Sequence, residues 1–190
     1  VKELLKESSG LEIVDNYLIP ALDIVGQKYE RGEIFLPQLI QSAETVKRAF
    51  EILKDNMDAG SGSDSQIEKG KIVIATVKGD IHDIGKNIVK ILLENYGFRV
   101  YDLGKDVPIE KVVEKTAEEN APLVGLSALM TTTVQNMEDT IKALRLRCPG
   151  CRIMVGGAGL NESYAEMIGA DFYVKDARES VKVAQDIFGK

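Results

Sequence analysis

The chain has 190 residues, a length typical of one compact domain or two small ones. Lys and Arg total 24 against 30 Asp and Glu, a formal net charge of -6 that argues against binding to nucleic-acid phosphates. Hydrophobic residues make up 44% of the chain, and no apolar run approaches the roughly 18 residues of a membrane span, so the composition predicts a globular cytoplasmic protein without a membrane segment.

Residues 1–58 show no strand pattern and are predicted to be helical. Apolar residues recur at helical spacing from Leu11 to Tyr29 and again from Leu39 to Leu53. Pro20 and Pro37 suit the first turns of helices. Only a short Arg-Gly-Glu turn separates the two patterns, which predicts an antiparallel helical bundle as a first domain.

Residues 59–70 are rich in Gly and Ser and are predicted to be a linker. Beyond the linker, residues 71–190 alternate short β-branched runs with amphipathic helices. The predicted strands are 72–77, 99–103, 123–127, 152–155 and 171–174, and the predicted helices are 85–96, 109–119, 134–147, 162–168 and 177–188. This alternation predicts a doubly wound, flavodoxin-like α/β domain with a five-stranded parallel sheet of order 2-1-3-4-5.

Ligands of such sheets bind beyond the carboxyl ends of the strands, where the strand order reverses. In the predicted order, strands one, three and four are neighbours. The loops that follow them, residues 78–86, 127–133 and 156–159, should therefore line one crevice. The only histidine of the chain, His82, lies in the first of these loops.

The first loop does not match the known phosphate-binding patterns. Five residues separate Gly79 from Gly85 where a P-loop has four, Asn87 follows Lys86 where a P-loop has Ser or Thr, and no G-x-G-x-x-G follows the first strand. What remains is Asp80 two residues before His82. A neutral imidazole can bind a transition metal through one nitrogen while its other nitrogen donates a hydrogen bond to a carboxylate. Asp80 and His82 could form such a pair, and the alternative interpretation is that His82 is a solvated loop histidine.

The three loops together resemble the signature of the cobalamin-binding domain family. The matching residues are Asp80-x-His82-x-x-Gly85, Ser127-x-Leu129 and Gly156-Gly157, and the resemblance spans residues 71–190. It implies a cobalamin or another corrinoid, such as methylcobalamin, as cofactor, with His82 as the lower axial ligand of cobalt in place of the corrinoid's own base. It also implies that Asp80 and Thr133, at a position where methionine synthases usually carry Ser, relay a proton to His82.

Further cofactor-binding residues follow from the same resemblance. They are Asp83, Ile84, Gly85, Ser127, Leu129, Thr131, Thr133, Gly156 and Gly157. The glycines would let backbone approach a bulky nucleotide tail, and the hydroxyl groups would bind its polar atoms. Taken singly, the Gly-Gly pair is equally typical of a tight turn, and Ser127 of a local backbone cap.

The N-terminal residues restrict the resemblance to one group of cobalamin-binding proteins. The string Val25-Gly26-x-x-Tyr29-x-x-Gly32-x-x-Phe35-Leu36-Pro37 resembles the helical cap of cobalamin-dependent methionine synthases and of corrinoid proteins from methanogens and acetogens. Adenosylcobalamin mutases lack this cap. The resemblance implies that Tyr29, Leu36 and Leu39 shield the upper face of the corrin, whereas the spacing of Leu36 and Leu39 alone is typical of bundle core.

The resemblance implies a methyl carrier that cycles between cobalt(I) and methylcobalt(III). One reading is a fragment of methionine synthase, which moves a methyl group from methyltetrahydrofolate to homocysteine, and the start at Val1 is compatible with a fragment. The alternative is the corrinoid subunit of a methanol, methylamine or methoxyaromatic methyltransferase. Either would need methyl-donor and methyl-acceptor methyltransferase domains or subunits and a reductive activation protein as partners.

Two other classes share part of the pattern. A receiver-type signalling domain has the same strand order but needs a phosphorylatable Asp where this chain has Ser127, and a hydrolase using His82 would lack a nucleophile elbow. Cys148-Pro-Gly-Cys151 precedes the fourth strand, at the edge opposite the three loops. We interpret it as a turn with incidental thiols, with a disulfide or an intersubunit metal site as the alternatives.

Overall fold

The computed structural model describes residues 1–8, 10–57 and 69–189, which form two compact units. The first unit comprises Val1–Lys69 together with Glu94–Gly97, and the second comprises Gly70–Leu93 and Phe98–Lys190. Except for its last two residues, the predicted linker lies outside the described residues, and the domain boundaries stay a prediction. No helix in the described ranges combines the length and apolar character that crossing a membrane requires.

The first unit is helical. Its elements are the 3-10 helix η1 (Leu4–Lys6), α1 (Gly10–Ile13), the π-helix η2 (Val14–Leu18), α2 (Ile19–Glu30) and α3 (Leu36–Met57). Proline opens α2 and α3, as the sequence predicts. Ile13 and Leu53 are fully buried in this unit. The π-helix is an irregularity that apolar spacing does not reveal, because it changes the hydrogen-bond pattern and not the residue types.

The second unit contains the predicted five-stranded parallel sheet. The strands are β1 (Lys71–Thr76), β2 (Arg99–Asp102), β3 (Leu123–Ser127), β4 (Arg152–Gly156) and β5 (Phe172–Val174). Their order is β2-β1-β3-β4-β5, and every neighbouring pair is parallel. The sheet therefore reverses its direction of growth between β1 and β3, and all carboxyl ends lie at one edge.

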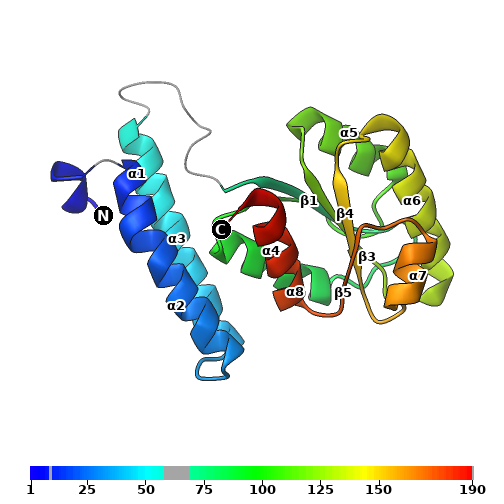
Figure 1. Ribbon diagram of the computed structural model, residues 1–190, viewed down its shortest axis with the longest axis horizontal. Coiled ribbons are helices and arrows are strands. Elements are labelled where there is room, and N and C mark those ends of the chain that lie inside the picture. The colour runs from blue at the N-terminus through cyan, green and yellow to red at the C-terminus, as the bar shows by residue number, and fades with distance from the viewer. Residues whose placement is uncertain (9, 58–68, 190) are drawn as a thin grey trace. The chain divides into compact units, whose positions relative to one another are not determined.

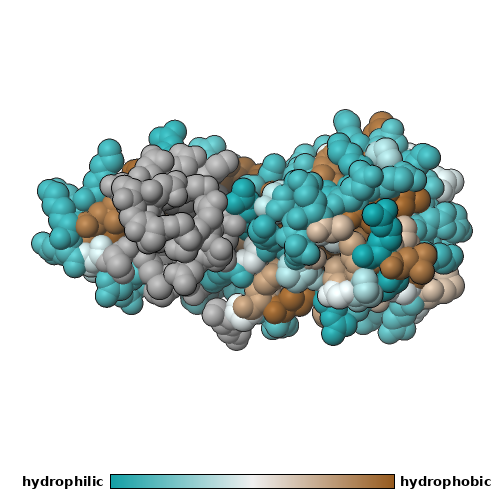
Figure 2. Space-filling view, turned by 90° about the horizontal axis from the view of Figure 1, so that it is seen from above, coloured by the Kyte–Doolittle hydropathy of each residue, from teal (hydrophilic) through white to brown (hydrophobic). Residues whose placement is uncertain are grey.

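Helices cover both faces of the sheet. They are α4 (Ile84–Asn95), α5 (Ile109–Glu119), the 3-10 helix η3 (Thr131–Thr133), α6 (Val134–Arg147), α7 (Glu162–Met167) and α8 (Ala177–Phe188). Figure 1 shows α4 and α8 on one side of the sheet and α5, α6 and α7 on the other. On the face seen in Figure 2, polar and charged side chains cover most of the surface of this unit, with smaller apolar areas between them.

The two faces of the sheet differ in how tightly they are filled near the carboxyl edge. Toward α5, α6 and α7, Val73, Val124 and Val155 belong to one buried apolar cluster. On the other face, Ile74, Gly125 and Met154 pair across three strands, so the central position of that row has no side chain. Small residues in a buried row leave room between the sheet and the helices that cover it.

Candidate functional site

Asp80 is the centre of a hydrogen-bond cluster between the loops after β1 and β3. Its side chain is fully buried. One carboxylate oxygen, Oδ2, accepts from the amides of Leu129 at 2.8 Å and Met130 at 3.2 Å and from the hydroxyl of Thr133 at 2.9 Å. The other oxygen, Oδ1, lies 3.0 Å from the amide nitrogen of His82 and 2.8 Å from its ring Nδ1.

These donors keep the carboxylate ionised. Burial by itself would raise the pKa of Asp80, but the amides of His82, Leu129 and Met130 and the imidazole of His82 together hold that pKa well below its usual range. An ionised acceptor has no proton to share, so the ring nitrogen that faces it must carry the hydrogen. Neutral His82 is therefore held as the Nδ1–H tautomer, which leaves Nε2 with a free lone pair.

The His82 side chain lies at the surface of this unit. The side chain is 46% exposed, and within the described ranges no hydrogen-bond partner is found for Nε2. The same ranges contain no group of three or more His, Cys, Asp or Glu side chains that could hold a metal ion. A metal bound by this imidazole would therefore have to bring most of its own ligands, as the metal of a macrocycle does.

Exposed apolar side chains lie on the two loops that meet at Asp80. Ile81 is 64% exposed, Ile84 78%, Leu129 42% and Met130 40%. Several exposed apolar side chains on neighbouring segments are typical of a binding surface.

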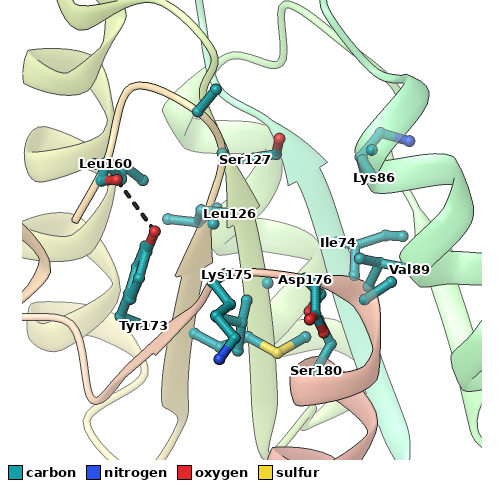
Figure 3. Close-up of a pocket in the computed structure, with 18 residues that line it drawn as sticks. Ile74, Lys86, Val89, Leu126, Ser127, Leu160, Tyr173, Lys175, Asp176 and Ser180 are labelled. Atoms are coloured by element: carbon teal, nitrogen blue, oxygen red, sulfur yellow. Dashed lines mark hydrogen bonds between the residues drawn. The ribbon is translucent and has the colours of Figure 1, made fainter. Parts of the chain in front are cut away.

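A cavity of about 340 Å³ opens between the carboxyl half of the sheet and helices α4 and α8. Ile74, Gly125 and Met154 form its floor on the sheet, and in Figure 3 Val89 and Tyr173 lie on opposite sides of it. Its volume is in the range of small-molecule sites. The cavity exists because Gly125 and Gly156 leave two positions on β3 and β4 without side chains, and a Cβ on Gly156 would crowd the Val174 carbonyl at 2.9 Å.

Polar groups line the remaining walls of the cavity. Lys86 is almost fully buried, and its Nζ donates to Asp102 Oδ1 at 2.6 Å and to Asn87 Oδ1 at 2.9 Å. The Tyr173 hydroxyl donates to the carbonyl of Leu160 at 3.2 Å, as Figure 3 shows. Burial would raise the pKa of Asp102, but the Lys86 ammonium and the Gly104 amide lower it overall, so the Asp102 carboxylate stays ionised.

The cofactor-binding residues predicted in the second unit fall into three groups. Asp80, His82 and Thr133 are joined by hydrogen bonds. Gly85, Ser127, Gly156 and Gly157 line the cavity, to which Asp80, His82 and Thr133 do not contribute. The crevice expected from the sequence is thus a cavity with a hydrogen-bonded cluster at the same edge of the sheet. The last four predicted residues, Asp83, Ile84, Leu129 and Thr131, lie outside the cavity on the same loops and are partly or largely exposed.

Most of the residues that line the cavity are not evident from the sequence. Ile74, Val89, Met154, Tyr173, Asp176 and Ser180 all line it and were not predicted. Their side chains look like ordinary core or helix-capping residues in the sequence. Gly125 is the exception, because a glycine inside the buried apolar strand Leu-Val-Gly-Leu-Ser indicates a close approach of a ligand or of backbone, and this signal could have located the cavity floor.

The three predicted shielding residues lie in the first unit. Tyr29 is partly buried near the end of α2, Leu36 is partly buried at the start of α3, and Leu39 is fully buried one turn later. Cys148 and Cys151 are free thiols. The amide of Cys151 donates to the carbonyl of Cys148 at 3.0 Å, so the pair forms the expected turn at the amino edge of β4.

Both parts of the chain match families of the same description. Residues 70–184 and residues 1–54 each match a family model described as a B12 binding domain. The chain is 44% identical to dimethylamine corrinoid protein 1 of Methanosarcina acetivorans, over 98% of this chain and 87% of that protein. It also resembles the methanol:cobalamin methyltransferase complex from Methanosarcina barkeri, with a TM-score of 0.82 and 32% identity over 95% of this chain and 69% of that one.

A second solved structure is similar over nearly its whole length. A cobalamin-binding protein from Desulfitobacterium hafniense has a TM-score of 0.72 and 32% identity, over 97% of this chain and 87% of that chain. At this identity and coverage the likeness includes both the helical unit and the α/β unit.

Proposed function

Because this chain belongs to the family of B12-binding corrinoid proteins and so uses cobalamin or another corrinoid as its cofactor, we propose that it carries methyl groups in a methylamine methyltransferase system, with His82 as the lower ligand of cobalt. Corrinoid proteins of this family belong to methyltransferase systems, and the relative from Methanosarcina acetivorans is named a dimethylamine corrinoid protein. The names of the similar proteins, a dimethylamine corrinoid protein and a methanol:cobalamin methyltransferase complex, favour a methylamine or methanol system over a methionine synthase fragment.

The single observation that carries the proposal is the pairing of Asp80 with the only histidine. Asp80 Oδ1 lies 2.8 Å from Nδ1 of His82, so Nε2 of this 46% exposed side chain is left as the ligand. A carboxylate behind a metal-binding imidazole fixes the ring orientation and raises its basicity. The residues present therefore fit a corrinoid whose cobalt takes one nitrogen from the protein and the others from the macrocycle.

The surroundings of His82 support the same assignment. Ile81, Ile84, Leu129 and Met130 would lie under the macrocycle and lose their contact with water when it binds. The cavity on the α4 and α8 face would hold the nucleotide tail of the corrinoid. Tyr29, Leu36 and Leu39 would shield the opposite face of the corrin, as the resemblance implies.

The chain's own residues would control where a proton sits. A bound corrinoid supplies a cobalt centre that accepts and gives up a methyl group. The ionised Asp80 would keep a proton on Nδ1 of His82 and so leave Nε2 to the cobalt. The hydroxyl of Thr133 lies 2.9 Å from Asp80 Oδ2 and 2.8 Å from the Met130 carbonyl oxygen, and would take part with Asp80 in relaying a proton to His82, as the resemblance implies.

The proposal also requires partner proteins. The described residues contain no cluster of three or more His, Cys, Asp or Glu side chains that could hold a metal ion and activate a methyl acceptor. We therefore assign methyl donation and acceptance to separate methyltransferase subunits, and reduction of inactive cobalt to an activating protein. The complex of the similar methanol:cobalamin methyltransferase provides the precedent for the first kind of partner.

Replacement of His82 by Gly tests the ligand assignment. The full chain is reconstituted with methylcobalamin, and the visible spectra of the two proteins are compared. We expect the wild type to show an imidazole-ligated spectrum and His82→Gly to lose it, because the chain has no other histidine. Added free imidazole should restore the ligated spectrum in the variant, which separates a lost ligand from a misfolded loop. An unchanged spectrum in His82→Gly would refute the assignment.

A further inference from the structure

The loop that follows β2 is tied to β1 by backbone hydrogen bonds. The Leu103 amide donates to the Ile74 carbonyl at 2.9 Å, the Thr76 amide to the Gly104 carbonyl at 3.0 Å, and the Val107 amide to the Thr76 carbonyl at 3.1 Å. Val77 and Val107 also form a parallel bridge. The loop thus extends the sheet pairing past the end of β2 and is fixed on both sides of Asp106.

Asp106 holds the segment that leads to His82 by two hydrogen bonds. Its amide donates to the carbonyl of Asp80 at 2.9 Å, and its carboxylate Oδ1 accepts from the amide of Gly79 at 2.7 Å. The two bonds enclose the peptide between Gly79 and Asp80. They fix the backbone of Asp80 from one side, whereas the bonds from Leu129 and Met130 fix its side chain.

The backbone of Asp106 adopts an unfavourable conformation to make these bonds. Its φ is +52°, and among the described residues other than glycine only Asp106 and Asn120 have a positive φ. Asp and Asn tolerate this left-handed region better than other residues with a Cβ, at some cost in energy. Asn120 has an ordinary role, since it terminates α5. Asp106 does not end a helix. Its left-handed conformation instead accompanies the hydrogen bond that its carboxylate accepts from the Gly79 amide.

A second side chain holds the same segment from the opposite side. Asn136, in the first turn of α6, donates from Nδ2 to the carbonyl of Lys78 at 2.8 Å. The three consecutive residues Lys78, Gly79 and Asp80 are therefore held by loops and helices that follow two different strands. Such support is what keeps a ligand and its carboxylate partner in one geometry.

We propose that Asp106 is a positioning residue for His82, acting through the backbone of Gly79 and Asp80. The inference rests on the proposed function, in which His82 binds the cobalt of the corrinoid. Without the carboxylate of Asp106, the Gly79 amide loses its acceptor and the loop gains freedom. The Asp80 carboxylate then moves relative to the imidazole, and the preference for the Nδ1–H tautomer weakens.

Three variants of the full chain separate the carboxylate from the backbone strain. Asp106→Gly removes the acceptor and relieves the left-handed strain, so a loss of function in this variant belongs to the carboxylate. Asp106→Asn keeps an acceptor oxygen and tolerates the same φ, so it should restore the wild-type behaviour. Asn120→Gly is the matched control, because it relieves the same kind of strain at the end of α5.

Two measurements are made on each variant. Because the chain has a single histidine, nitrogen-15 NMR of the protein without cofactor reports the tautomer of His82 without overlap. We expect the Nδ1–H form to dominate in wild type, Asp106→Asn and Asn120→Gly, and a mixture of tautomers in Asp106→Gly. After reconstitution, we expect Asp106→Gly to retain methylcobalamin about tenfold more weakly and with a smaller imidazole-ligated fraction, as for other residues behind a metal ligand.

The outcomes distinguish this inference from the proposed function. If Asp106→Gly keeps the wild-type tautomer and spectrum, or if Asp106→Asn shows the defect of Asp106→Gly, the positioning role is wrong. If His82→Gly leaves the spectrum unchanged, the proposed function fails, but the tautomer measurement still tests whether Asp106 orients the imidazole.

Discussion

At the scale of single residues, Asp80 shows how one buried carboxylate can connect two loops. The charge of a buried carboxylate is tolerated only when its lone pairs are filled by donors. Asp80 meets this requirement with two amides from the β3 loop, the hydroxyl of Thr133, and the amide and ring of His82. Its folding role and its proposed catalytic role therefore use the same hydrogen bonds.

Thr133 is the donor to Asp80 that can be removed with the least change of shape. Thr133→Val replaces the hydroxyl by a methyl group, so Asp80 loses one donor while two amides remain on the same oxygen. We expect a loss of about 1 kcal/mol in the free energy of unfolding. Because Asp80 is then held less firmly, we also expect a smaller imidazole-ligated fraction after reconstitution with methylcobalamin.

Thr133→Ser provides the control for this prediction. It keeps the hydroxyl and removes one buried methyl, so it should lose a similar free energy of unfolding, about 0.8 kcal/mol, and keep the wild-type spectrum. Urea unfolding and the visible spectrum measure the two effects. If Thr133→Val and Thr133→Ser give the same spectrum, the hydroxyl has no part in holding the Asp80 and His82 pair.

At the scale of elements, the site depends on how close two loops at the carboxyl edge approach each other. Gly157, in the loop after β4, has a φ of +134°, and a Cβ built on it would overlap the carbonyl oxygen of Ala128 in the loop after β3. The two loops also share a backbone bond, from the Ala128 amide to the Gly156 carbonyl at 3.2 Å. Position 157 therefore requires glycine for two reasons, the positive φ and the lack of space for a Cβ next to Ala128.

Gly157→Ala tests this close approach. The added methyl must push the β4 loop away from Ala128 and distort the wall of the cavity, so we expect a loss of about 3 kcal/mol in the free energy of unfolding and weaker corrinoid retention. Gly104→Ala is the control, since Gly104 also has a positive φ of +91° but has open space around its Cβ position. It should lose only about 1 kcal/mol, the cost of the conformation itself. Equal losses in the two variants would contradict the role assigned to the contact.

Helices, strands and nearby residue pairs could be predicted from the sequence, whereas most of the cavity wall could not. Apolar periodicity predicted α5, α6 and α8 to the residue, because each of these helices buries one regular face. The order of the five strands was predicted from the doubly wound fold that alternating strands and helices indicate. The Asp80 and His82 pair was also predictable, since the two residues are close in sequence and chemically specific. The cavity wall at Tyr173 and Ser180 was not, because those residues come together only through the register of β4 with β5 and the packing of α8.

At the scale of the whole molecule, several acidic residues are held ionised by partners. Burial would raise the pKa of Asp171, but Arg145, the amide of Ile153 and Arg152 lower it overall. Hydrogen bonds from Lys115, Tyr101 and Lys71 lower the pKa of Glu119 to about 2. Together with Asp80, these residues show that carboxylates with a lowered pKa occur at both the carboxyl and the amino edge of the sheet.

These shifts predict that the protein loses stability in acid. A carboxylate whose pKa is lower in the folded state stabilises the fold fully above its unfolded pKa of roughly 4, and that contribution is lost as the pH falls through the folded value. Between those limits the unfolded chain binds more protons, so the free energy of unfolding should fall by about 1.4 kcal/mol per pH unit for each proton of difference. Urea unfolding between pH 7 and pH 3 measures this slope.

Asp171→Asn identifies one contributor to that slope away from the cofactor loops. Asp171 accepts from Arg145 at 2.7 Å, Arg152 at 2.9 Å and the Ile153 amide at 2.7 Å, all at the amino side of β4 and β5. An amide in its place does not titrate, so the variant should be less stable than wild type at pH 7 and show a shallower loss between pH 4 and pH 3. Because the site at the opposite edge is unchanged, its corrinoid spectrum should match the wild type. A stability that stays constant or rises toward pH 3 in the wild type would mean that the paired carboxylates do not control acid unfolding.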